Sequence, residues 1–464
     1  MNKYRKLFSN SLVFAIGNLG SKMITFFMVP LYTRYLTTSQ YGKSDVLSTL
    51  VSLLTPILTL SIIDAVFRFA MDENSDNSKV LTNGIFLSLI SLVVFAVVSP
   101  IVHQFDYAVY VCLLTYMSAI ESMFQQFARG IGKSKLYATT GIIMTAATVI
   151  SNIILIVWQG WALQGYLASM MVAQIVGLLF LFISLRSWKY IHLTAIDIEF
   201  LKRMLVYSIP LIPNMVSWWL SNSANKIFIS FMLGTAANGI YAVANKIPSL
   251  ISVFYSIFTQ AWQISAVEEF KSKDVGAFFS KVMSATISVL MMGVAILTLW
   301  SQLLVRILST PAYYDAWRIV PWLALAVLFS SVSSFLGTVY TASMKTGKLF
   351  TTTIVGALVN VGSNVLLIPL LGVVGAGTGA ALSFLVVTLL RFRDSKRFIN
   401  LKVTWTPFVI AFVIILGEIL ALNVLPGIIG FSVAGGCTLL VFIINWKIIS
   451  PMLSKTISAV FKRK

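Results

Sequence analysis

Long apolar stretches recur along the whole chain and are separated by short polar connections. Each stretch has about 20 residues or more, the length that an α-helix needs to cross the hydrocarbon core of a bilayer. The pattern therefore predicts an all-α polytopic membrane protein. The fourteen expected transmembrane helices lie at residues 9–31, 46–70, 80–101, 107–127, 137–158, 164–185, 206–231, 237–261, 279–304, 319–343, 349–370, 373–390, 405–425 and 427–446.

The composition agrees with this prediction. The chain has 464 residues, of which 58% are hydrophobic and 11% are charged. Soluble domains carry about 25% charged residues, so the composition excludes a soluble globular fold.

Basic residues are distributed unequally between the two sides of the predicted topology. An even number of spans places both termini on one side, where the connections carry 26 of the 34 Lys and Arg residues, against 4 on the opposite side. Because cytoplasmic connections are enriched in Lys and Arg, we expect both termini in the cytoplasm. The net charge of +19 then reflects topology and attraction to anionic lipids, and no nucleic-acid binding is expected.

A weak internal repeat predicts two lobes of six helices each. The polar connection at residues 35–42, between spans one and two, has a counterpart at residues 231–241, between spans seven and eight. Six is an even number of spans, so the two halves share one orientation and are related by a pseudo-two-fold axis along the membrane normal. The predicted parts are an N-terminal lobe (1–185), a cytoplasmic amphipathic linker lying along the membrane surface (186–204), a C-terminal lobe (205–398), and two additional helices with a basic cytoplasmic tail (399–464).

Basic residues inside the predicted spans are the strongest functional signal. A charge at membrane depth costs about 3 kcal/mol or more, so such a residue usually faces protein or a water-filled path. The first helix of each predicted lobe is polar and interrupted by Gly or Pro, a pattern that points to the central site of a transporter. The expected substrate-binding residues are Lys22, Arg68, Lys226, Lys246, Asn18 and Asn222.

Two acids, Asp64 and Glu121, lie in the first twelve spans. Asp64 and Arg68 are four residues apart, so they share one helix face and are expected to neutralise each other. The remaining cations still outnumber Glu121. An anionic headgroup such as a diphosphate would supply the missing counter-charge through charge-assisted hydrogen bonds.

Less specific explanations apply to several of these residues. Arg68 and Lys226 lie near the ends of their spans, from where a long basic side chain can reach the interface. The alternatives for the two deeper lysines, Lys22 and Lys246, are the same reach to the interface or a purely structural pairing. Trp218 and Trp219 are expected to serve in packing or cavity lining rather than as a specific sugar platform, although aromatic faces suit sugar rings.

Signatures of catalysis are absent from the sequence. It has no Walker A motif, no His/Cys metal-ligand spacing, no nucleophile elbow and no paired-carboxylate site. We therefore expect a transporter that is not an enzyme, with no cofactor and no bound metal.

Short polar motifs follow one another along the chain. They are GNLGSK (17–22), PLYTRYL (30–36), YG (41–42), ID (63–64), RF (68–69), QQFARG (125–130), YSIPLIPN (207–214) and NGIYAVANKIP (238–248). In this order they resemble the motifs of Wzx-type oligosaccharide flippases, the polysaccharide-transport branch of the superfamily that also contains MATE drug exporters and lipid II flippases. The resemblance covers essentially the whole chain, although no single motif is as specific as a nucleotide-binding loop.

The resemblance implies a flippase in the bacterial inner (plasma) membrane. Its cargo would be an undecaprenyl-diphosphate-linked oligosaccharide, moved from the cytoplasmic to the outer leaflet for surface polysaccharide assembly. Alternating access through a cationic central cavity would move it, and Asp64 or Glu121 would carry a coupling proton or sodium ion. Family members often have an acid where this chain has Asn225, which argues against ion coupling beside Lys226. The implied partners are membrane lipids, a polysaccharide polymerase and glycosyltransferases.

Three other functions remain open from the sequence. A lipid II flippase would move a peptidoglycan precursor across the membrane by the same mechanism. An ion-coupled drug exporter usually takes cationic cargo and would need an acid-rich cavity, whereas bases predominate here. A membrane-bound glycosyltransferase or polymerase would need a large outer loop with catalytic carboxylates or arginines, whereas the predicted outer connections are short.

Overall fold

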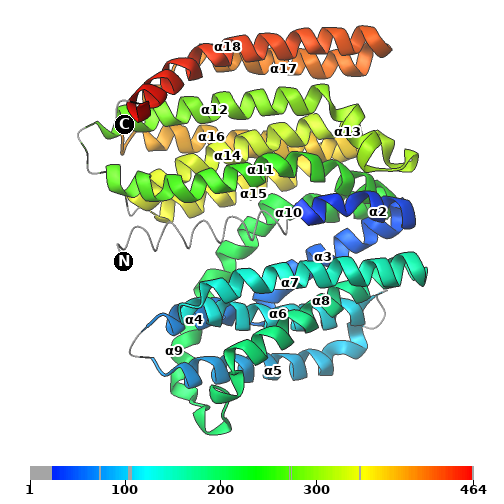
Figure 1. Ribbon diagram of the computed structural model, residues 1–464, viewed down its shortest axis with the longest axis vertical. Helices are drawn as coiled ribbons and strands as arrows, with labels where there is room; N and C mark the ends of the chain where they lie inside the picture. Colours follow the sequence, from blue (N-terminus) through cyan, green and yellow to red (C-terminus); the bar gives the residue numbers. More distant parts are fainter. Residues whose placement is uncertain are drawn as a thin grey trace. The chain divides into compact units, whose positions relative to one another are not determined.

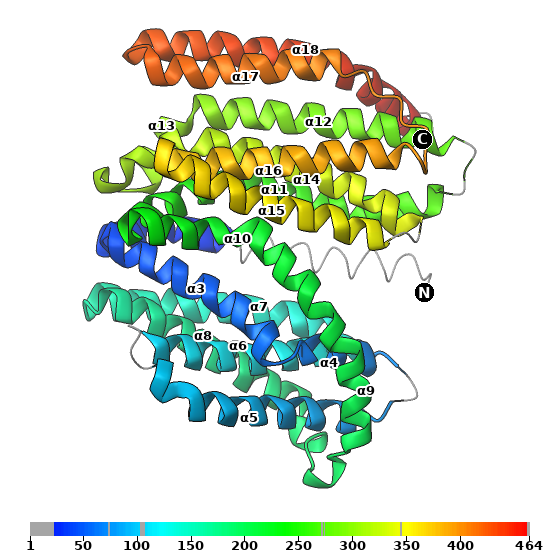
Figure 2. The ribbon, with the colours of Figure 1, turned by 180° about the vertical axis from the view of Figure 1, so that it is seen from behind.

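The computed structural model describes residues 23–72, 75–102, 107–270, 272, 274–343 and 346–461 (Figures 1 and 2). Within these residues the chain is helical and contains no β-strand. This confirms the predicted all-α fold of a polytopic membrane protein. Two of the expected substrate-binding residues, Asn18 and Lys22, lie outside the described residues.

The chain divides into two compact units, Met1–Trp219 and Leu220–Lys464. The division falls within a helix, whereas the predicted lobes are separated by the linker at residues 186–204 and stay a prediction. Helices of the first unit are α2 (Val29–Tyr35), α3 (Thr38–Leu58), α4 (Ile62–Ala70), α5 (Asn77–Val102), α6 (Ala108–Gly130), α7 (Ser134–Asn152), α8 (Ala162–Leu185), α9 (Ile198–Ser208) and the start of α10 (Ile212–Leu233). A π-helix, Ile153–Trp158, continues α7, and 3₁₀ turns occur at Ser187–Lys189, Leu193–Ala195 and Ile209–Leu211.

The second unit begins in α10 and contains eight further α-helices in its described part. They are α11 (Thr235–Glu269), α12 (Val275–Leu299), α13 (Ser301–Leu308), α14 (Val320–Ala342), α15 (Thr346–Leu371), α16 (Val373–Ser395), α17 (Thr406–Val424) and α18 (Gly427–Phe461), with a 3₁₀ segment at Pro311–Arg318. α14 packs against α16, and α15 against α16, while α17 and α18 pair with each other and α18 contacts α12.

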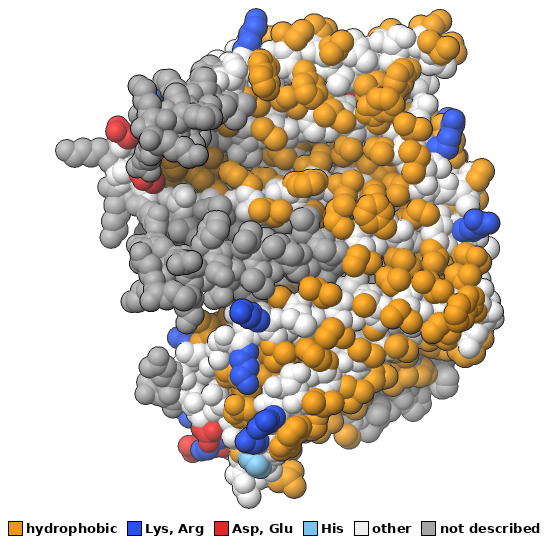
Figure 3. Space-filling view, in the orientation of Figure 1, with side chains coloured by type: hydrophobic (Ala, Val, Ile, Leu, Met, Phe, Trp, Pro, Cys, Tyr) orange, Lys and Arg blue, Asp and Glu red, His pale blue; other side chains and the backbone are white. Residues whose placement is uncertain are grey.

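Nine helices among the described residues are long and apolar enough to cross a membrane, and α3 with α4 forms a tenth candidate if this pair, bent by 63°, is one span. The predicted spans at 80–101, 107–127 and 206–231 also coincide with helices, namely α5, α6 and α10. Figure 3 shows hydrophobic side chains spread over most of the face in view, with few Lys or Arg side chains among them. Such a surface suits the hydrocarbon core of a bilayer.

Local sequence explains where α3 begins. The Thr37 hydroxyl accepts a hydrogen bond from the Gln40 backbone N–H at 3.2 Å, and the Gln40 side chain accepts one from the Thr37 backbone N–H at 3.0 Å. This reciprocal pair satisfies two N–H groups that a helix start otherwise leaves unpaired. The polar connection predicted at residues 35–42 is therefore a helix start.

A tight hairpin joins α15 to α16. Gly372 has a φ of +62°, which only glycine adopts without strain. Three residues later, a Cβ added at Gly375 would come within 2.1 Å of the Leu367 carbonyl oxygen. The absence of a side chain at Gly375 therefore allows the backbones of the two helices to pack closely.

The segment that joins α8 to α10 packs against other helices of the first unit. Phe200, Leu201 and Met204 of α9 are buried in the same hydrophobic cluster as Ile62 and Val66 of α4. The sequence suggested that this amphipathic segment lies along the membrane surface. These three α9 side chains are covered by protein, which removes them from water, whereas Ile198 of the same helix is 52% exposed. The position of the segment along the membrane surface stays a prediction.

An ion pair fixes the start of α9. One Asp197 oxygen accepts from the Phe200 backbone N–H at 3.0 Å, and the other accepts from Lys79 Nζ on α5 at 2.8 Å. Asn83 bonds the same segment, since its side chain donates to the Ala195 carbonyl and accepts from the Asp197 N–H. The hydrogen bond with Lys79 holds the pKa of Asp197 below its usual range.

Asp197→Asn is expected to lower the melting temperature at pH 7, because Asn keeps a helix-capping oxygen and loses the ion pair. Since the folded-state pKa of Asp197 is lowered, its stabilisation is present at neutral pH and is lost as the pH falls through that pKa. The difference between the two proteins should therefore vanish in acidic buffer, as measured by thermal unfolding in detergent. Asp274→Asn is the matched control, because Asp274 precedes α12 and makes no side-chain cap bond; an equal effect there would contradict the role of the ion pair.

Candidate functional site

The bend between α3 and α4 contains two consecutive residues with left-handed backbone. Leu60 and Ser61 both adopt left-handed conformations, with φ of 50° and 53°. Such conformations are unfavourable for residues other than glycine and tend to occur at functional sites. The bend is stabilised locally, because the Ser61 N–H donates to the Pro56 carbonyl at 2.8 Å. It places Asp64 in the first turn of α4.

A cavity of about 510 Å³ opens beside this bend, and we call it the bend cavity. It lies entirely within the first unit, between α3, α4, α6 and the first turns of α10. Most of its polar groups are hydroxyls and amides, and Asp64 is the one charged side chain among the described residues that line it. The lining residues are Ser52, Leu53, Thr55, Pro56, Thr59, Ser61, Ile63, Asp64, Ser118, Ser122, Gln126, Asn214, Met215, Val216, Trp218 and Trp219.

Trp219 has a fixed orientation in the wall of the bend cavity. Its indole Nε1–H donates to the Thr49 carbonyl and to the Ser52 hydroxyl, both at 3.1 Å. Trp218, the preceding residue, is 47% exposed. The structure thus places both indoles in the lining of a cavity, one of the two roles that the sequence suggested for them.

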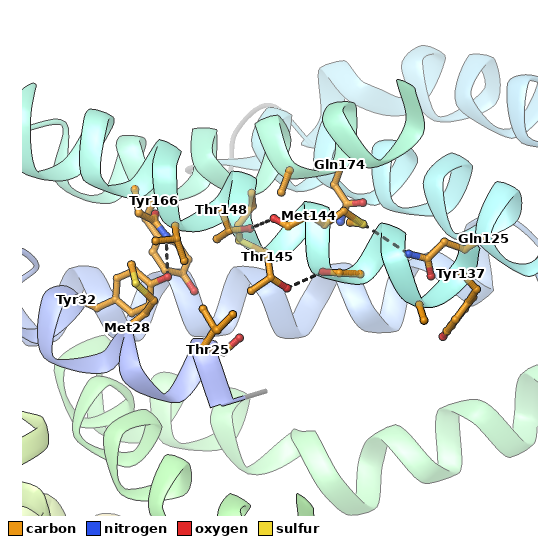
Figure 4. Close-up of a pocket in the computed structure, with 17 residues that line it drawn as sticks. Thr25, Met28, Tyr32, Gln125, Tyr137, Met144, Thr145, Thr148, Tyr166 and Gln174 are labelled. Carbon is orange, nitrogen blue, oxygen red and sulfur yellow. Dashed lines mark hydrogen bonds between the residues drawn. The ribbon is translucent and has the colours of Figure 1, made fainter. Parts of the chain in front are cut away.

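A second cavity, of about 390 Å³, lies within the same unit between α2, α6, α7 and α8 (Figure 4). At one end the Tyr32 hydroxyl accepts from Asn152 Nδ2 at 2.8 Å, and the Tyr32 and Tyr166 rings meet edge to face at 4.9 Å. At the other end Gln125 points toward Met144, with 3.6 Å between Nε2 and Sδ. Apolar side chains and uncharged polar groups line the cavity together, and no charged side chain lines it among the described residues.

Glu121 lies close to this second cavity without lining it. It is one helical turn before Gln125 on α6, and its side chain is 3% exposed. Its Cγ lies only 3.4 Å from where a Cβ would stand at Gly177 of α8, so the glycine gives the carboxyl room between the helices. One carboxyl oxygen, Oε1, has no hydrogen-bond partner among the described residues.

Three asparagines form a buried cluster in the second unit, beside Lys226. Asn364 donates to Asn225 Oδ1 at 2.7 Å and to Asn360 Oδ1, while Asn360 donates to the Ser221 carbonyl at 2.9 Å. Asn225 also donates to the Tyr241 hydroxyl on α11 and to a backbone carbonyl of α16. The exposed fraction of each asparagine is at most 2%. This asparagine cluster joins α10, α11, α15 and α16 through uncharged groups.

Asn225→Asp should destabilise the protein by about 1–3 kcal/mol, because a carboxylate cannot donate to the Tyr241 hydroxyl or to the α16 carbonyl. Thermal unfolding of the purified protein measures the loss. Asn222→Asp is the control, since Asn222 is exposed on the same helix. Equal melting temperatures for the two variants would contradict a stabilising role for the asparagine cluster.

The predicted site residues lie in both units. Asp64, Arg68 and Glu121 belong to the first, whereas Asn222, Lys226 and Lys246 belong to the second. Arg68 is exposed in the last turn of α4, Asn222 is exposed on α10, and the two lysines are half-buried on α10 and α11. Their contact with substrate stays a prediction.

The expected ion pair between Asp64 and Arg68 does not occur. Both residues are described, and they occupy the first and last turns of α4 respectively. The helix dipole is positive at the N-terminus and negative at the C-terminus, so it favours the Asp64 carboxylate at the start of α4 and the Arg68 cation at its end. Asp64 faces the bend cavity instead.

The sequence interpretation missed the asparagine cluster and the bend. Asn360 and Asn364 stand four apart in a predominantly apolar span, a readable signal of one polar helix face. The predicted span at 46–70 is not one continuous helix: it contains Pro56, and α3 ends two residues after that proline. Proline removes a backbone donor and crowds the preceding turn, so it favours such an interruption.

A sequence model described as polysaccharide biosynthesis protein matches residues 7–263, which is more than half of the chain. The chain belongs to this family. No match was found among curated proteins.

Solved structures resemble this family member over most of its length. Against the lipid II flippase MurJ in an inward closed conformation the TM-score is 0.68, with 13% identity over 95% of this chain and 99% of that one. Against an inward-facing MATE multidrug transporter of the MOP superfamily it is 0.67, with 15% identity over 83% and 98%. For a mutant of the Vibrio cholerae MATE transporter VcmN it is 0.58, with 12% identity over 85% and 97%. At these identities the likeness establishes the fold.

Proposed function

We propose that this protein is a flippase of the Wzx type. It moves undecaprenyl-diphosphate-linked oligosaccharide from the cytoplasmic to the outer leaflet of the bacterial cell membrane, for surface polysaccharide assembly. The observation that carries the proposal is the combination of polysaccharide-biosynthesis family membership with the fold of membrane flippases and transporters. No catalytic step is proposed.

Cations in both units support an anionic cargo. Lys22, Arg68, Lys226 and Lys246 are proposed to hold the diphosphate, with Asn18 and Asn222 as polar contacts. Diphosphate oxygens form charge-assisted hydrogen bonds with such groups, and these are about twice as strong as neutral ones. The two units would alternate between inward- and outward-open states while the lipid tail stays in the bilayer.

A coupling ion requires an acid, and the first unit supplies two. Glu121 is buried near the second cavity, and Asp64 lines the bend cavity. Either can carry a proton or a sodium ion in the proposed cycle. The asparagine cluster has no acid, and it contributes no carboxylate ligand for such an ion.

Transport in vesicles tests the proposed function. The purified protein is reconstituted into liposomes whose inner leaflet contains a fluorescent undecaprenyl-diphosphate oligosaccharide, and exposure of the label to a membrane-impermeant quencher is followed. Quenching of inner-leaflet label is expected at a rate above that of protein-free vesicles. Equal rates in the two preparations would contradict the proposal.

A lipid II flippase is the second candidate, because the MurJ structure covers nearly the whole fold. The same vesicle assay with lipid II, and rescue of cells depleted of their own lipid II flippase, distinguish the two. Faster transport of lipid II than of the oligosaccharide substrate, together with rescue, would favour this candidate. An ion-coupled drug exporter is less consistent with the excess of bases over acids in the predicted spans.

A further inference from the structure

We propose that the bend cavity is a carbohydrate subsite that binds a sugar ring of the cargo. The inference rests on the proposed function, because that function supplies the glycan. It adds a second recognition site to the cationic residues, with different chemistry. Asp64 then contacts sugar, and Glu121 is left as the candidate for ion coupling.

The aromatic wall of the bend cavity suits the apolar face of a sugar ring. The Trp219 ring is held by its two hydrogen bonds to α3, so little conformational entropy is lost when a ligand stacks on it. Trp218 adds a second indole to the lining, 47% exposed. Sugar C–H groups make weak attractive contacts with the electron-rich faces of such rings.

The polar wall of the bend cavity suits sugar hydroxyls. Ser118, Ser122 and Gln126 lie at successive turns of one face of α6, and Asn214 adds a further amide from α10. Hydroxyl and amide side chains can both donate and accept, as hydroxyls of a sugar do. Asp64 supplies a stronger acceptor, because an ionised carboxylate forms charge-assisted bonds with O–H donors.

Charge and size separate this subsite from a diphosphate site. The one charge among the described lining residues is negative, and a carboxylate repels phosphate oxygens. The volume of about 510 Å³ falls in the range of about 300–1,000 Å³ that is typical of small-ligand pockets. A neutral or amino sugar fits these properties, and the diphosphate is left to the cations.

Binding by the full-length protein in nanodiscs tests the subsite. The probes are methyl glycosides of glucose, galactose, N-acetylglucosamine, N-acetylgalactosamine and rhamnose, followed by saturation-transfer NMR, and undecaprenyl diphosphate without sugar, followed by thermal shift. At least one glycoside should bind the wild-type protein. Asp64→Asn should weaken that binding about tenfold or more, because it removes a charged acceptor, and should leave undecaprenyl diphosphate binding unchanged.

Variants of the tryptophans complete the test. Trp219→Ala and Trp218→Ala should each weaken glycoside binding, whereas Trp219→Phe, which keeps an aromatic face, should retain more of it. Trp158→Phe is the matched control, because Trp158 is 76% exposed at the end of the π-helix. If Trp219→Ala does not fold, then Asp64→Asn and Trp218→Ala decide the question.

The outcomes separate the two proposals. If undecaprenyl diphosphate binds and no glycoside does, the subsite is wrong and the flippase proposal stands. Unchanged glycoside binding in Asp64→Asn and Trp218→Ala would also overturn the subsite. If a glycoside binds as expected and undecaprenyl diphosphate does not, the subsite is supported, and the proposed lipid-linked cargo is contradicted.

Discussion

Cells whose only copy of the protein carries Lys246→Ala are expected to make no surface polymer while keeping normal amounts of the protein in the membrane. Lys246 is half-buried on α11, next to the fully buried residues Tyr241–Ala244. Losing a hydrogen bond between charged groups costs about 1.5–3 kcal/mol, which would reduce diphosphate binding by about tenfold or more. Truncation to alanine within a helix leaves the fold intact, because alanine has the highest helix propensity.

Three further variants make this result specific. Lys246→Arg keeps the cation and should retain much of the polymer, whereas Lys202→Ala removes an exposed lysine on α9 and should have no effect. Lys22→Ala is expected to behave like Lys246→Ala, because both residues are proposed to hold the diphosphate. Polymer is measured by immunoblotting of cell extracts and protein by a C-terminal tag. Normal polymer in both Lys246→Ala and Lys22→Ala would contradict the proposed role of the cations.

Arg391→Met is expected to destabilise the second unit by about 3 kcal/mol or more. Arg391 lies in α16 and is 4% exposed. Its guanidinium donates to the Thr352 hydroxyl at 3.0 Å, to the Ser333 carbonyl at 2.9 Å and to the Thr353 hydroxyl at 3.0 Å. Each hydrogen bond to a charged group contributes about 1.5–3 kcal/mol, and methionine fills similar space while making none of them.

The neighbouring Arg393 provides the control, because it is exposed on the same helix. Arg393→Met should melt near the wild-type temperature, and Arg391→Met well below it, as measured by thermal unfolding in detergent. Similar melting temperatures for the two variants would mean that the hydrogen bonds to α14 and α15 contribute little. Reduced abundance of Arg391→Met in membranes is the expected consequence in cells.

Arg391 also shows a structural feature that the sequence alone could not predict. The hydropathy pattern ended the twelfth span at residue 390 and assigned Arg391 to a cytoplasmic connection, whereas α16 continues to Ser395. A charged residue ends an apolar stretch whether or not the helix ends there. Its partners come from two other helices, more than 35 residues away in the sequence, so local periodicity could not reveal that it is buried.

The same reasoning explains what was and was not predictable in the first unit. Apolar stretches of sufficient length predicted the helices α5 to α8, because span length depends only on local sequence. The bend cavity depends on residues from α3, α4, α6 and α10 meeting in space, and on left-handed backbone at Leu60 and Ser61. Neither residue type favours that conformation, so only the packing of the whole unit reveals it.

The asparagine cluster has an electrical consequence. Moving one elementary charge across the membrane changes the free energy by about 2.3 kcal/mol per 100 mV, and a carboxylate in this place would feel part of that field. The side chains of Asn225, Asn360 and Asn364 carry no charge at any physiological pH, and their bonds to one another need no counter-ion. The hydrogen bonds among the three asparagines therefore contribute no gating charge of their own.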